Sequence, residues 1–483
     1  MKNLLYIISL CGLLTACDLQ EEPYGFYSDD NFYKSETDAE SGLLYAYNAL
    51  TFLEYSRGIF YIGDIPTETM SPKSDEAGDV YQLENWIANR ETEQLQYYFK
   101  YCYIAINRAN TVIDHIQNSS VLSETARRRI LGEAYFLRAW NYFNLVRTFG
   151  IVPVQTKMVA ELSQTTPPMA TGLDQLYDLI LGDLTRADNL LEVNKVFGRA
   201  DKVAAQSLMA KAYLTIASSK EHNVHRYTEM RREPQIMYDS AAYWAGKVVR
   251  DYKNVYDFDT NLRDIYDVDK PTGPEHIFIM PIDRSGTQEG NYSKLPLLFL
   301  PSNNSVPFYI RYGNGDLQRA NGNGWGVFLC NDEFVETQFS TTDKRRTELI
   351  HRDIYDASGN PIVPNQVKGY FSSKYVDPDF IGERTSARPY LIRFSDIALV
   401  YAEAAGPEAG LAYVNRIRER AGVTPLPSGM TTDKFREAVI KERALELAFE
   451  GNRLYDLRRT ASVTTTDIKA AGLSEAEAAY YPI

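Results

Sequence analysis

Residues 390–459 contain three apolar-rich segments in succession: YLIRFSDIALVYAEAA (390–405), AYVNRIRERAGV (412–423) and REAVIKERALELAFEGNRLYDLRR (436–459). In the first segment Phe394, Ile397 and Tyr401 recur at helical spacing, which predicts a helix with one apolar stripe. The second segment ends at Ala421-Gly422, a glycine stop that is typical of helix C-termini. Three consecutive helices are therefore expected in this region.

The third segment predicts a helix that is apolar around most of its circumference. A helix of this kind is normally buried between neighbouring helices. Its remaining stripe carries Arg443, Glu446 and Glu450, with Arg453 just beyond. Because a buried charge is costly unless it is paired, we expect these charges to pair with one another. We therefore interpret this region as the structural base of the protein and not as its working edge.

Helical patterns also recur upstream of this base. Apolar-periodic segments occupy residues 36–57, 95–116, 127–150, 173–191, 198–218 and 237–248. The helices come in pairs that start near residues 37, 125, 199 and 391, which predicts four tetratricopeptide-like units. Such pairs stack into a curved solenoid that offers an extended surface.

A block of different composition, residues 252–389, interrupts this helical pattern. It holds ten of the 21 prolines and shows no long helical period. PEHIFIMPI (274–282) alternates enough to predict a short strand, and GNGDLQRANGNGWGVF (313–328) reads as a glycine- and asparagine-rich loop. A long irregular insertion in a compact domain is usually functional, and a rigid scaffold that displays loops suits binding.

The N-terminus predicts export. Lys2 is followed by an apolar run from Leu4 to Leu14, which is too short to span a bilayer as a permanent anchor. The run ends in Leu14-Thr15-Ala16-Cys17, which resembles a bacterial lipobox, so Cys17 is expected to be acylated. The acidic residues that follow it predict a tether to the scaffold.

Charge and cysteine content narrow the function classes. The formal net charge of −13 disfavours nucleic-acid binding, which requires a basic surface, and a polybasic grip on lipid headgroups. Cys11 lies in the predicted signal peptide. The two remaining cysteines, Cys102 and Cys330, are far apart and form neither a disulfide framework nor a metal-site spacing. We expect them to be buried free thiols.

Two motifs carry a family resemblance. RFSDIALVYAEAA (393–405) together with KERALELAFEGNRLYDLRR (441–459) resembles the C-terminal signature of the SusD/RagB family, and GEAYFLRAWNYFNLVRTFGIVPV (132–154) resembles a second signature. Members of that family are surface lipoproteins of Bacteroidetes that bind nutrients, mostly glycans, and cap a TonB-dependent outer-membrane transporter. The resemblance implies a mainly α fold, a superhelix of four tetratricopeptide-like units with a large irregular insertion containing short strands.

The resemblance also implies an organisation and a function for the whole chain. The expected parts are a signal peptide (1–16), an acidic tether (17–35), a helical scaffold (36–251 and 390–470) and a ligand-binding insertion (252–389). The implied protein is not an enzyme and needs no cofactor. It is anchored through Cys17 on the extracellular face of the outer membrane, binds an oligosaccharide and delivers it to a SusC-like transporter.

Sugar recognition predicts where the ligand would bind. Sugar rings stack on exposed aromatic faces, and their hydroxyl groups bind amides, carboxylates and guanidinium groups. Two stretches offer this mixture, GDVYQLENWIAN (78–89) and NNSVPFYIRYGNGDLQRANGNGWG (303–326). The candidate residues are Tyr81, Asn85, Trp86, Asn303, Tyr309, Arg311, Tyr312, Asn321, Asn323 and Trp325. For Trp86 and Trp325, packing in the core is an equally open alternative. Trp140 and Trp244 lie on helix stripes and are expected in the core.

The sequence contains no complete motif for metal binding or for nucleophilic catalysis. His222 and His225 lack a third metal ligand nearby, and the stretch from Asp257 lacks the glycine and glutamate of a calcium loop. The five histidines show no nucleophile–base pattern. Two alternatives stay open: a surface glycoside hydrolase, because acidic pairs are abundant, and a tetratricopeptide-type adaptor that binds a protein peptide in its groove.

Overall fold

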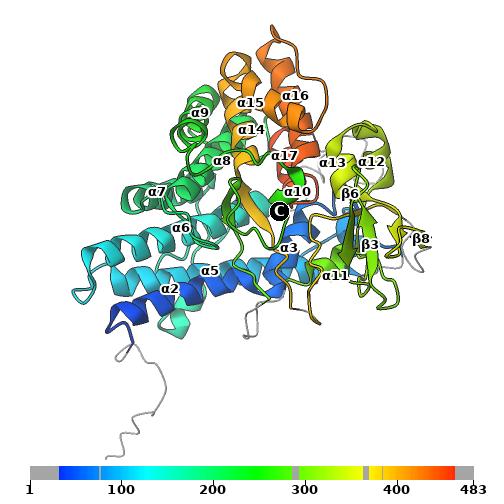
Figure 1. Cartoon of the computed structure of the whole chain (residues 1–483). Coiled ribbons are helices and arrows are strands. Elements are labelled where there is room, and N and C mark those ends of the chain that lie inside the picture. The colour runs from blue at the N-terminus through cyan, green and yellow to red at the C-terminus, as the bar shows by residue number, and fades with distance from the viewer. Residues whose placement is uncertain (1–31, 75–77, 285–292, 363–368, 383, 463–483) are drawn as a thin grey trace, which may run out of the picture.

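A computed structural model describes residues 32–74, 78–284, 293–362, 369–382 and 384–462 of the chain. Figure 1 shows a stack of long helices beside a smaller region of strands and short helices. We call the long helices the scaffold, and we keep the name insertion for residues 252–389.

The scaffold helices pack against one another in sequence order. They are α2 (Glu36–Thr51), α5 (Glu93–Ile116), α6 (Glu124–Phe149), α7 (Leu173–Leu190), α8 (Lys202–Glu221), α9 (Pro234–Asp251), α14 (Phe394–Ala405), α15 (Pro407–Arg420), α16 (Thr432–Glu446) and α17 (Arg453–Arg459). Each helix from α2 to α9 contacts the next in this list, α9 contacts α14, and α14 contacts α15 and α16 (Figure 1). The predicted mainly α fold of stacked helical pairs is confirmed.

Local sequence explains where these helices begin and end. Ser35 caps α2 in a reciprocal capping box with Asp38, and Ser123 caps α6. Gly150 ends α6 at a φ of +73°, a conformation that glycine adopts without strain. α6 is buried on almost every side, and Trp140 lies in the core as predicted. Trp244 on α9 is only partly buried, so the core prediction for that residue is wrong.

The remaining α-helices and strands lie before α5, in the insertion or directly after it. Those before α5 are α3 (Leu53–Gly63), β1 (Met70–Pro72) and α4 (Asp79–Glu84). Those in the insertion are α10 (Leu262–Ile265), β2 (His276–Ile279), α11 (Leu295–Phe299), β3 (Phe308–Arg311), β4 (Leu317–Ala320), β5 (Phe328–Cys330), α12 (Asp332–Gln338), α13 (Lys344–Leu349), β6 (Ile350–His351), β7 (Ile354–Tyr355), β8 (Pro361–Ile362) and β9 (Phe371–Ser372). β10 (Tyr390–Arg393) then leads into α14.

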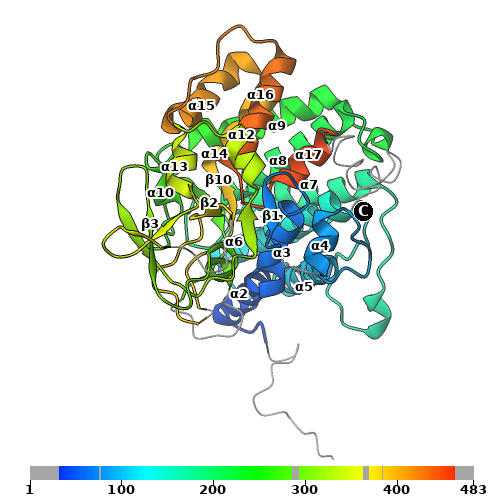
Figure 2. The same ribbon diagram turned by 90° about the vertical axis from the view of Figure 1, so that its right-hand side faces the viewer.

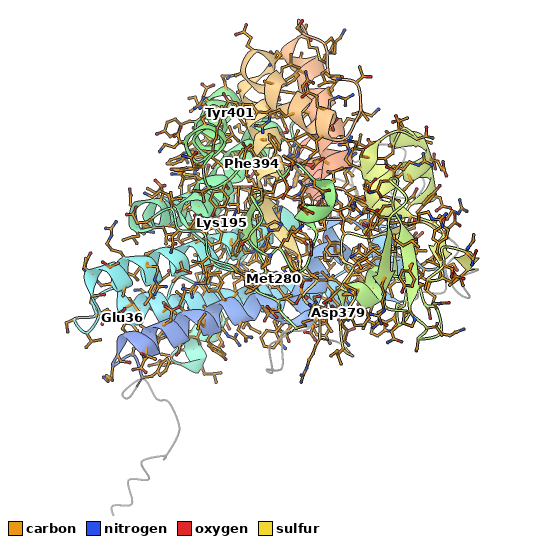
Figure 3. The ribbon with its side chains drawn as sticks, viewed as in Figure 1. Glu36, Lys195, Met280, Asp379, Phe394 and Tyr401 are labelled. Carbon is orange, nitrogen blue, oxygen red and sulfur yellow. The ribbon has the colours of Figure 1, made fainter. Side chains whose placement is uncertain are left out.

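The insertion is joined to the scaffold through the core. Its predicted strand is β2, which pairs antiparallel with β10. Phe278 on β2 packs edge-on against Phe136, with ring centroids 4.9 Å apart, and against Trp140 at 5.6 Å. Met280 and Phe394 are fully buried in the middle of the molecule, whereas Asp379 lies near the strands of the insertion (Figure 3). The two parts therefore share one hydrophobic core.

The third C-terminal segment is not one helix. α16 ends at Glu446, and the chain turns through Phe449 at a φ of +65° and Gly451 at +75° before α17 begins. A side chain at Gly63 would meet the backbone of Gly451 at 2.3 Å, so the two glycines allow a close approach of α3. The prediction of a continuous helix is wrong, because this turn carries Glu450 into the interior.

The predicted buried charges do pair, but with partners from other elements. Arg393 on β10 is 1% exposed and contacts three carboxylates, Glu275, Glu446 and Glu450, each at 2.8 Å. Further ion pairs of this cluster include Arg420–Glu275, Arg420–Glu446, Arg345–Glu442, Lys374–Glu450, Arg443–Asp396, Arg443–Asp456 and Arg459–Glu403. We call this set the charge cluster. It links the insertion to β10 and to helices α14 to α17.

The charge cluster predicts that the protein loses stability in acid. Burial alone would raise the pKa of Glu275, but Arg420 and Arg393 lower it to about 2. A carboxyl whose pKa is lowered by folding stabilises the fold above its unfolded pKa, near 4.5, and loses that contribution as the pH falls towards 2. Glu275 alone should account for about 2 kcal/mol between pH 5 and pH 3. Urea unfolding at pH 7, 5 and 3 measures this, and equal midpoints at pH 5 and pH 3 would contradict it.

Candidate functional site

A four-stranded antiparallel sheet, ordered β4-β3-β7-β8, forms part of the insertion. β3 and β4 form a hairpin around Asn314-Gly315, where Gly315 has a φ of +91° and donates its N–H to the carbonyl of Tyr312 at 2.9 Å. The stretch 313–328 was expected to be an irregular loop. That prediction is wrong for Leu317–Ala320, which pairs with β3 over four residues.

The two faces of this sheet differ in chemistry. Phe308, Ile310 and Ala320 point into a small core that also contains Ile354. On the other face, Tyr309 lies opposite Arg319 on one side and Tyr355 on the other, and Arg311 lies opposite Leu317. Residues directly opposite on neighbouring strands share a face. We call these residues (Tyr309, Arg311, Leu317, Arg319 and Tyr355) the sheet face.

The sheet face combines aromatic rings with guanidinium groups. Arg311 stacks on Tyr355, with its guanidinium carbon 4.2 Å from the ring centroid, and donates to the carbonyl of Gly359 at 2.5 Å. Arg311 and Arg319 are exposed, whereas Tyr309 and Tyr355 are half-buried. Half-buried rings on a sheet are held in place but still present surface to solvent. This arrangement suits a ligand with both apolar faces and hydrogen-bonding groups.

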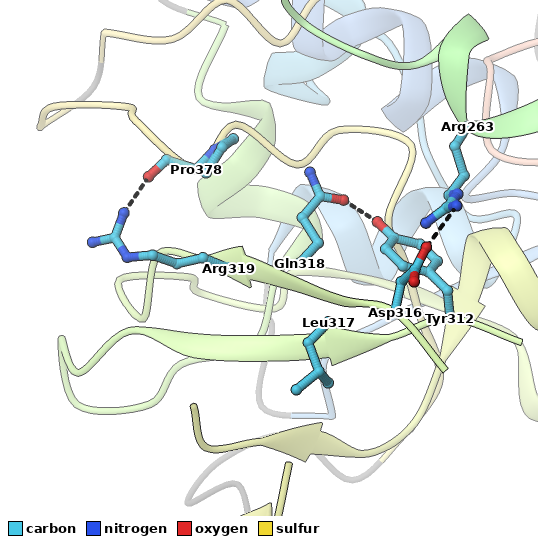
Figure 4. A pocket seen from close by; sticks show the side chains of 7 residues that line it. All are labelled: Arg263, Tyr312, Asp316, Leu317, Gln318, Arg319 and Pro378. Atoms are coloured by element: carbon cyan, nitrogen blue, oxygen red, sulfur yellow. Dashed lines mark hydrogen bonds and ion pairs between the residues drawn. The ribbon is translucent and has the colours of Figure 1, made fainter. Parts of the chain in front are cut away.

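A pocket of about 520 Å³ opens beside β4, at the rim of the sheet face. Its lining residues are Arg263, Tyr312, Asp316, Leu317, Gln318, Arg319 and Pro378, and we call it the rim pocket. In Figure 4, Gln318 points to Tyr312, Arg319 reaches to Pro378, and Leu317 points the other way. The hydrogen bond from Arg319 Nη1 to the Pro378 carbonyl measures 3.0 Å.

Tyr312 fixes the geometry of the rim pocket. Its hydroxyl donates to Gln318 Oε1, and the guanidinium of Arg263 lies 4.5 Å from its ring centroid. Arg263 also pairs with Asp316 at 3.1 Å. Burial raises the pKa of Tyr312 to about 12, so this phenol remains protonated at neutral pH. The pocket therefore offers preorganised hydrogen-bond donors and acceptors.

A second pocket, of about 350 Å³, adjoins the first and shares Arg263, Tyr312, Gln318 and Pro378 with it. It adds the carboxylates of Asp264, Asp267 and Asp269. Lys270 lies 2.8 Å from Asp264 and 3.4 Å from Asp267, and Arg284 lies 3.1 Å from Asp269. These acidic side chains are thus paired with cations. Together the two pockets form a polar hollow of the kind that hydroxyl-rich ligands need.

Three candidate residues from the stretch 303–326 lie at this site, though not all as expected. Tyr309 and Arg311 belong to the sheet face. Tyr312 lines both pockets but is only 6% exposed, so the expectation of an exposed ring there is wrong. Its ring packs edge-on against His351, 5.4 Å between centroids, where the strand turns back towards the core.

The other candidates of this stretch lie in the loops around the hairpin. Asn303 is buried and donates its amide to the carbonyl of Val306 at 2.9 Å, so it shapes the loop and is not exposed to a ligand. The Asn321 side chain donates to the Phe380 carbonyl and accepts a hydrogen bond from the backbone N–H of Asn323. Asn323 itself is exposed. Trp325 is 44% exposed, and Lys294 lies 5.5 Å from its ring.

The candidates from the stretch 78–89 lie elsewhere. Tyr81 on α4 is 53% exposed, and Asn85 donates its amide to the Tyr81 carbonyl. Trp86 is 6% exposed and packs in the main core, so of the two alternatives left open for this ring the structure favours core packing over ligand contact. The chain adopts a φ of +57° at Trp86, which turns it back onto the fold. Figure 2 shows α4 and β3 on opposite sides of α3, so Tyr81 and the sheet face form no single site.

Several residues of the site were not predicted. Arg319, Gln318 and Asp316 lie in the quoted stretch 303–326, and the alternation of β4 was the signal that would have indicated them. Tyr355 and Arg263 come from distant parts of the insertion. No local pattern marks them, because only the sheet order and the packing of α10 bring them to the hairpin.

In the described ranges, metal and thiol chemistry have little support. Within residues 32–462, excluding their gaps, no three His, Cys, Asp or Glu side chains are grouped so as to hold a metal ion. His222 caps the end of α8, with Nδ1 2.8 Å from the Ser218 carbonyl. Cys102 and Cys330 are buried free thiols, which confirms the prediction for both.

The predicted signal peptide and Cys17 lie outside the described residues. In the described part of the chain, no helix is both long and apolar enough to cross a membrane.

Comparison with known proteins identifies the family. The model of the SusD family matches residues 342–480, and the model described as starch-binding associating with outer membrane matches residues 33–214. A SusD-like protein of Formosa agariphila is 27% identical over 94% of this chain and 90% of its own length, and one of Bacteroides ovatus is 25% identical over 95% and 82%. The chain belongs to the SusD/RagB family.

Solved structures show the same fold. A SusD homolog from Bacteroides thetaiotaomicron superposes with a TM-score of 0.75 at 20% identity, over 92% of this chain and 90% of that one. A laminarin-binding SusD-like protein gives a TM-score of 0.72 at 23% identity, over 92% and 95%. A related structure that contains a xylogluco-oligosaccharide gives 0.71 at 20% identity, over 90% and 85%.

Proposed function

We propose that this protein is a surface lipoprotein that captures an oligosaccharide on the sheet face and in the rim pocket, without catalysis. The observation that carries the proposal is the pairing of Tyr309 and Tyr355 with two exposed arginines next to a polar hollow. A sugar ring can stack on the tyrosines, while Arg311 on the same face and Arg319 at the edge of β4 bind its hydroxyl groups.

The rigidity of the site supports this function. The sheet rests on its own small core, and the insertion is joined to the scaffold by the charge cluster, for example through Lys374, which lies 2.6 Å from Glu450. A site whose side chains are held in advance loses less entropy when the ligand binds. The solved relatives that bind laminarin or contain a xylogluco-oligosaccharide make glycans the first ligands to test.

We extend the proposal to transport. Acylation of Cys17 would hold the protein on the extracellular face of the outer membrane, with residues 17–35 as a tether. There it would act as the lid of a SusC-like TonB-dependent transporter and deliver the bound glycan. Purification of the lipidated protein from outer membranes, followed by identification of co-purified proteins, tests this. Absence of a transporter from such preparations would count against the lid.

The two alternative functions, a glycoside hydrolase and a peptide-binding adaptor, predict different results in activity and binding assays. A glycoside hydrolase would release new reducing ends from its polysaccharide, whereas we expect none after prolonged incubation with bound glycans. A peptide-binding adaptor would ignore sugars, whereas we expect saturable binding of at least one oligosaccharide in calorimetric titration.

Removal of one stacking ring should weaken this binding. In Tyr309→Ala the ligand loses an apolar contact worth about 1.5 kcal/mol, so affinity should fall roughly tenfold. Calorimetry with a panel of laminarihexaose, a xylogluco-oligosaccharide and hexagalacturonate measures the change. The matched control is Tyr243→Ala, because Tyr243 is a 54% exposed tyrosine on α9, outside the insertion. Equal losses in both variants, or none in Tyr309→Ala, would count against the sheet face.

A further inference from the structure

We infer that the sheet face selects acidic oligosaccharides, whose sugars carry carboxylate or sulfate groups. The inference rests on the proposed function, because it names the class of glycan that the same site binds. It is carried by Arg311 and Arg319, whose backbone positions adjoin Tyr309 on β3 and β4. The Arg311 guanidinium stacks on Tyr355, and the Arg319 guanidinium lies at the edge of β4, where Nη1 donates to the Pro378 carbonyl.

Arg311 is an exposed cation with no counter-charge in the described structure. Its contacts are the Gly359 carbonyl and the ring of Tyr355, and no described carboxylate lies within ion-pair distance of it. Stacking on a tyrosine face holds the planar guanidinium in one orientation and leaves its other N–H groups free. A planar guanidinium group of this kind can bind a carboxylate or sulfate through two parallel hydrogen bonds.

Arg319 occupies the neighbouring strand on the other side of Tyr309. Its side chain is 47% exposed, and its closest carboxylate, Asp379, is 3.9 Å away. Asp379 lies equally far from Arg284, at 3.9 Å, and is itself 64% exposed. A pair at this distance and exposure contributes little, so Arg319 retains capacity for an anionic ligand.

The position of Tyr309 between the arginines sets the geometry. Arg319 lies directly across from Tyr309, and Arg311 lies two residues along the same strand. On an antiparallel sheet these neighbours are roughly 5 to 7 Å away, about the width of one sugar ring. A ring stacked on Tyr309 therefore places its charged substituent within reach of one arginine, and the next sugar reaches the other.

Nearby acidic side chains do not cancel this charge. Asp316 is held by Arg263 at 3.1 Å and by the Asn314 amide. Asp356 accepts hydrogen bonds from Ser358 and Asn360 within its own turn. The net charge of −13 on the whole chain is screened beyond about 8 Å at physiological salt, so local groups decide what binds.

Titration of three hexasaccharides tests the inference: laminarihexaose (neutral), hexagalacturonate (carboxylate) and a chondroitin sulfate hexasaccharide (carboxylate and sulfate). We expect at least one acidic probe to bind tenfold or more tightly than laminarihexaose, and more weakly as salt rises from 50 to 300 mM. The double variant Arg311→Gln/Arg319→Gln should lose at least tenfold for that probe and a smaller factor for laminarihexaose, because the neutral probe loses hydrogen bonds but no charge interaction. Preference for hexagalacturonate assigns the anion as carboxylate, and preference for the sulfated probe assigns it as sulfate.

Controls separate the charge effect from folding and from general electrostatics. Both arginines are exposed, so the double variant should keep the melting temperature of the wild type. Arg90→Gln removes a side chain that is 92% exposed outside the insertion and should leave binding unchanged. Equal affinity for neutral and acidic probes, or an unaffected double variant, overturns the inference and leaves glycan binding intact. If no probe binds, both the inference and the proposed function fail.

Discussion

Arg393→Met is expected to lose about 3–5 kcal/mol of unfolding free energy, because it removes one cation shared by three buried carboxylates and leaves the cluster with an excess of buried negative charge. Arg393 is 1% exposed and contacts Glu275, Glu446 and Glu450 at 2.8 Å each. Methionine preserves much of the apolar stem, so the loss reports mainly on the charge. Urea unfolding at pH 7, followed by circular dichroism, measures it.

A matched control is available at the surface. Glu91→Ala breaks an ion pair with Arg90 whose two side chains are 72% and 92% exposed, and it should change stability by less than about 0.5 kcal/mol. If Arg393→Met unfolded at the same urea concentration as the wild type, the charge cluster would not be what joins β10 to the C-terminal helices.

Trp86→Ala is expected to cost about 3–5 kcal/mol, the usual range when a large buried aromatic side chain is removed. The indole is 6% exposed in the main core, next to α4. The same substitution at Trp325, which is 44% exposed, should cost no more than about 0.5 kcal/mol. Thermal unfolding of the two variants side by side tests the difference.

The two tryptophans also differ in their expected effect on binding. Trp86→Ala, measured below its melting temperature, should bind glycans as the wild type does, because the ring is not exposed to a ligand. A folded Trp86→Ala variant with wild-type stability and reduced affinity would contradict this expectation. It would show that Trp86 contacts the ligand and that the ring is not buried in the conformation that binds.

The helical scaffold could be predicted from sequence because its signals are local. Apolar residues at a period near 3.6 mark α5 and α7, and Gly150 marks the end of α6. The family motifs fall on buried helices and on the charge cluster, for instance Glu446 and Glu450. The break in the last segment was missed because its cause is tertiary: Glu450 must reach Arg393 and Lys374.

The candidate site was only partly predictable. Asn314-Gly315 is a strong hairpin signal, and together with the alternation of β3 and β4 it would have placed Arg319 beside Tyr309. The prediction relied instead on the glycines as loop markers. Arg263 and Tyr355 reach the site through packing of separate segments, which no periodicity records. Trp86 and Asn303 were included by residue type alone, and burial removes them from the surface.

The charge cluster that stabilises the fold also supports the candidate binding surface. Arg345 and Lys374 of the insertion pair with Glu442 and Glu450 beside the C-terminal helices. These contacts hold the base of the insertion while the sheet face, on its own small core, is presented to solvent. Preorganisation of this kind is what a binding surface requires from its scaffold.

The most direct test of this account is calorimetric titration of the oligosaccharide panel into the wild-type protein and into Tyr309→Ala. We predict saturable binding of one glycan class to the wild type and a roughly tenfold weaker affinity in the variant, at unchanged stability. Wild-type affinity in Tyr309→Ala, or heat signals no larger than dilution for every glycan, would contradict glycan capture on the sheet face.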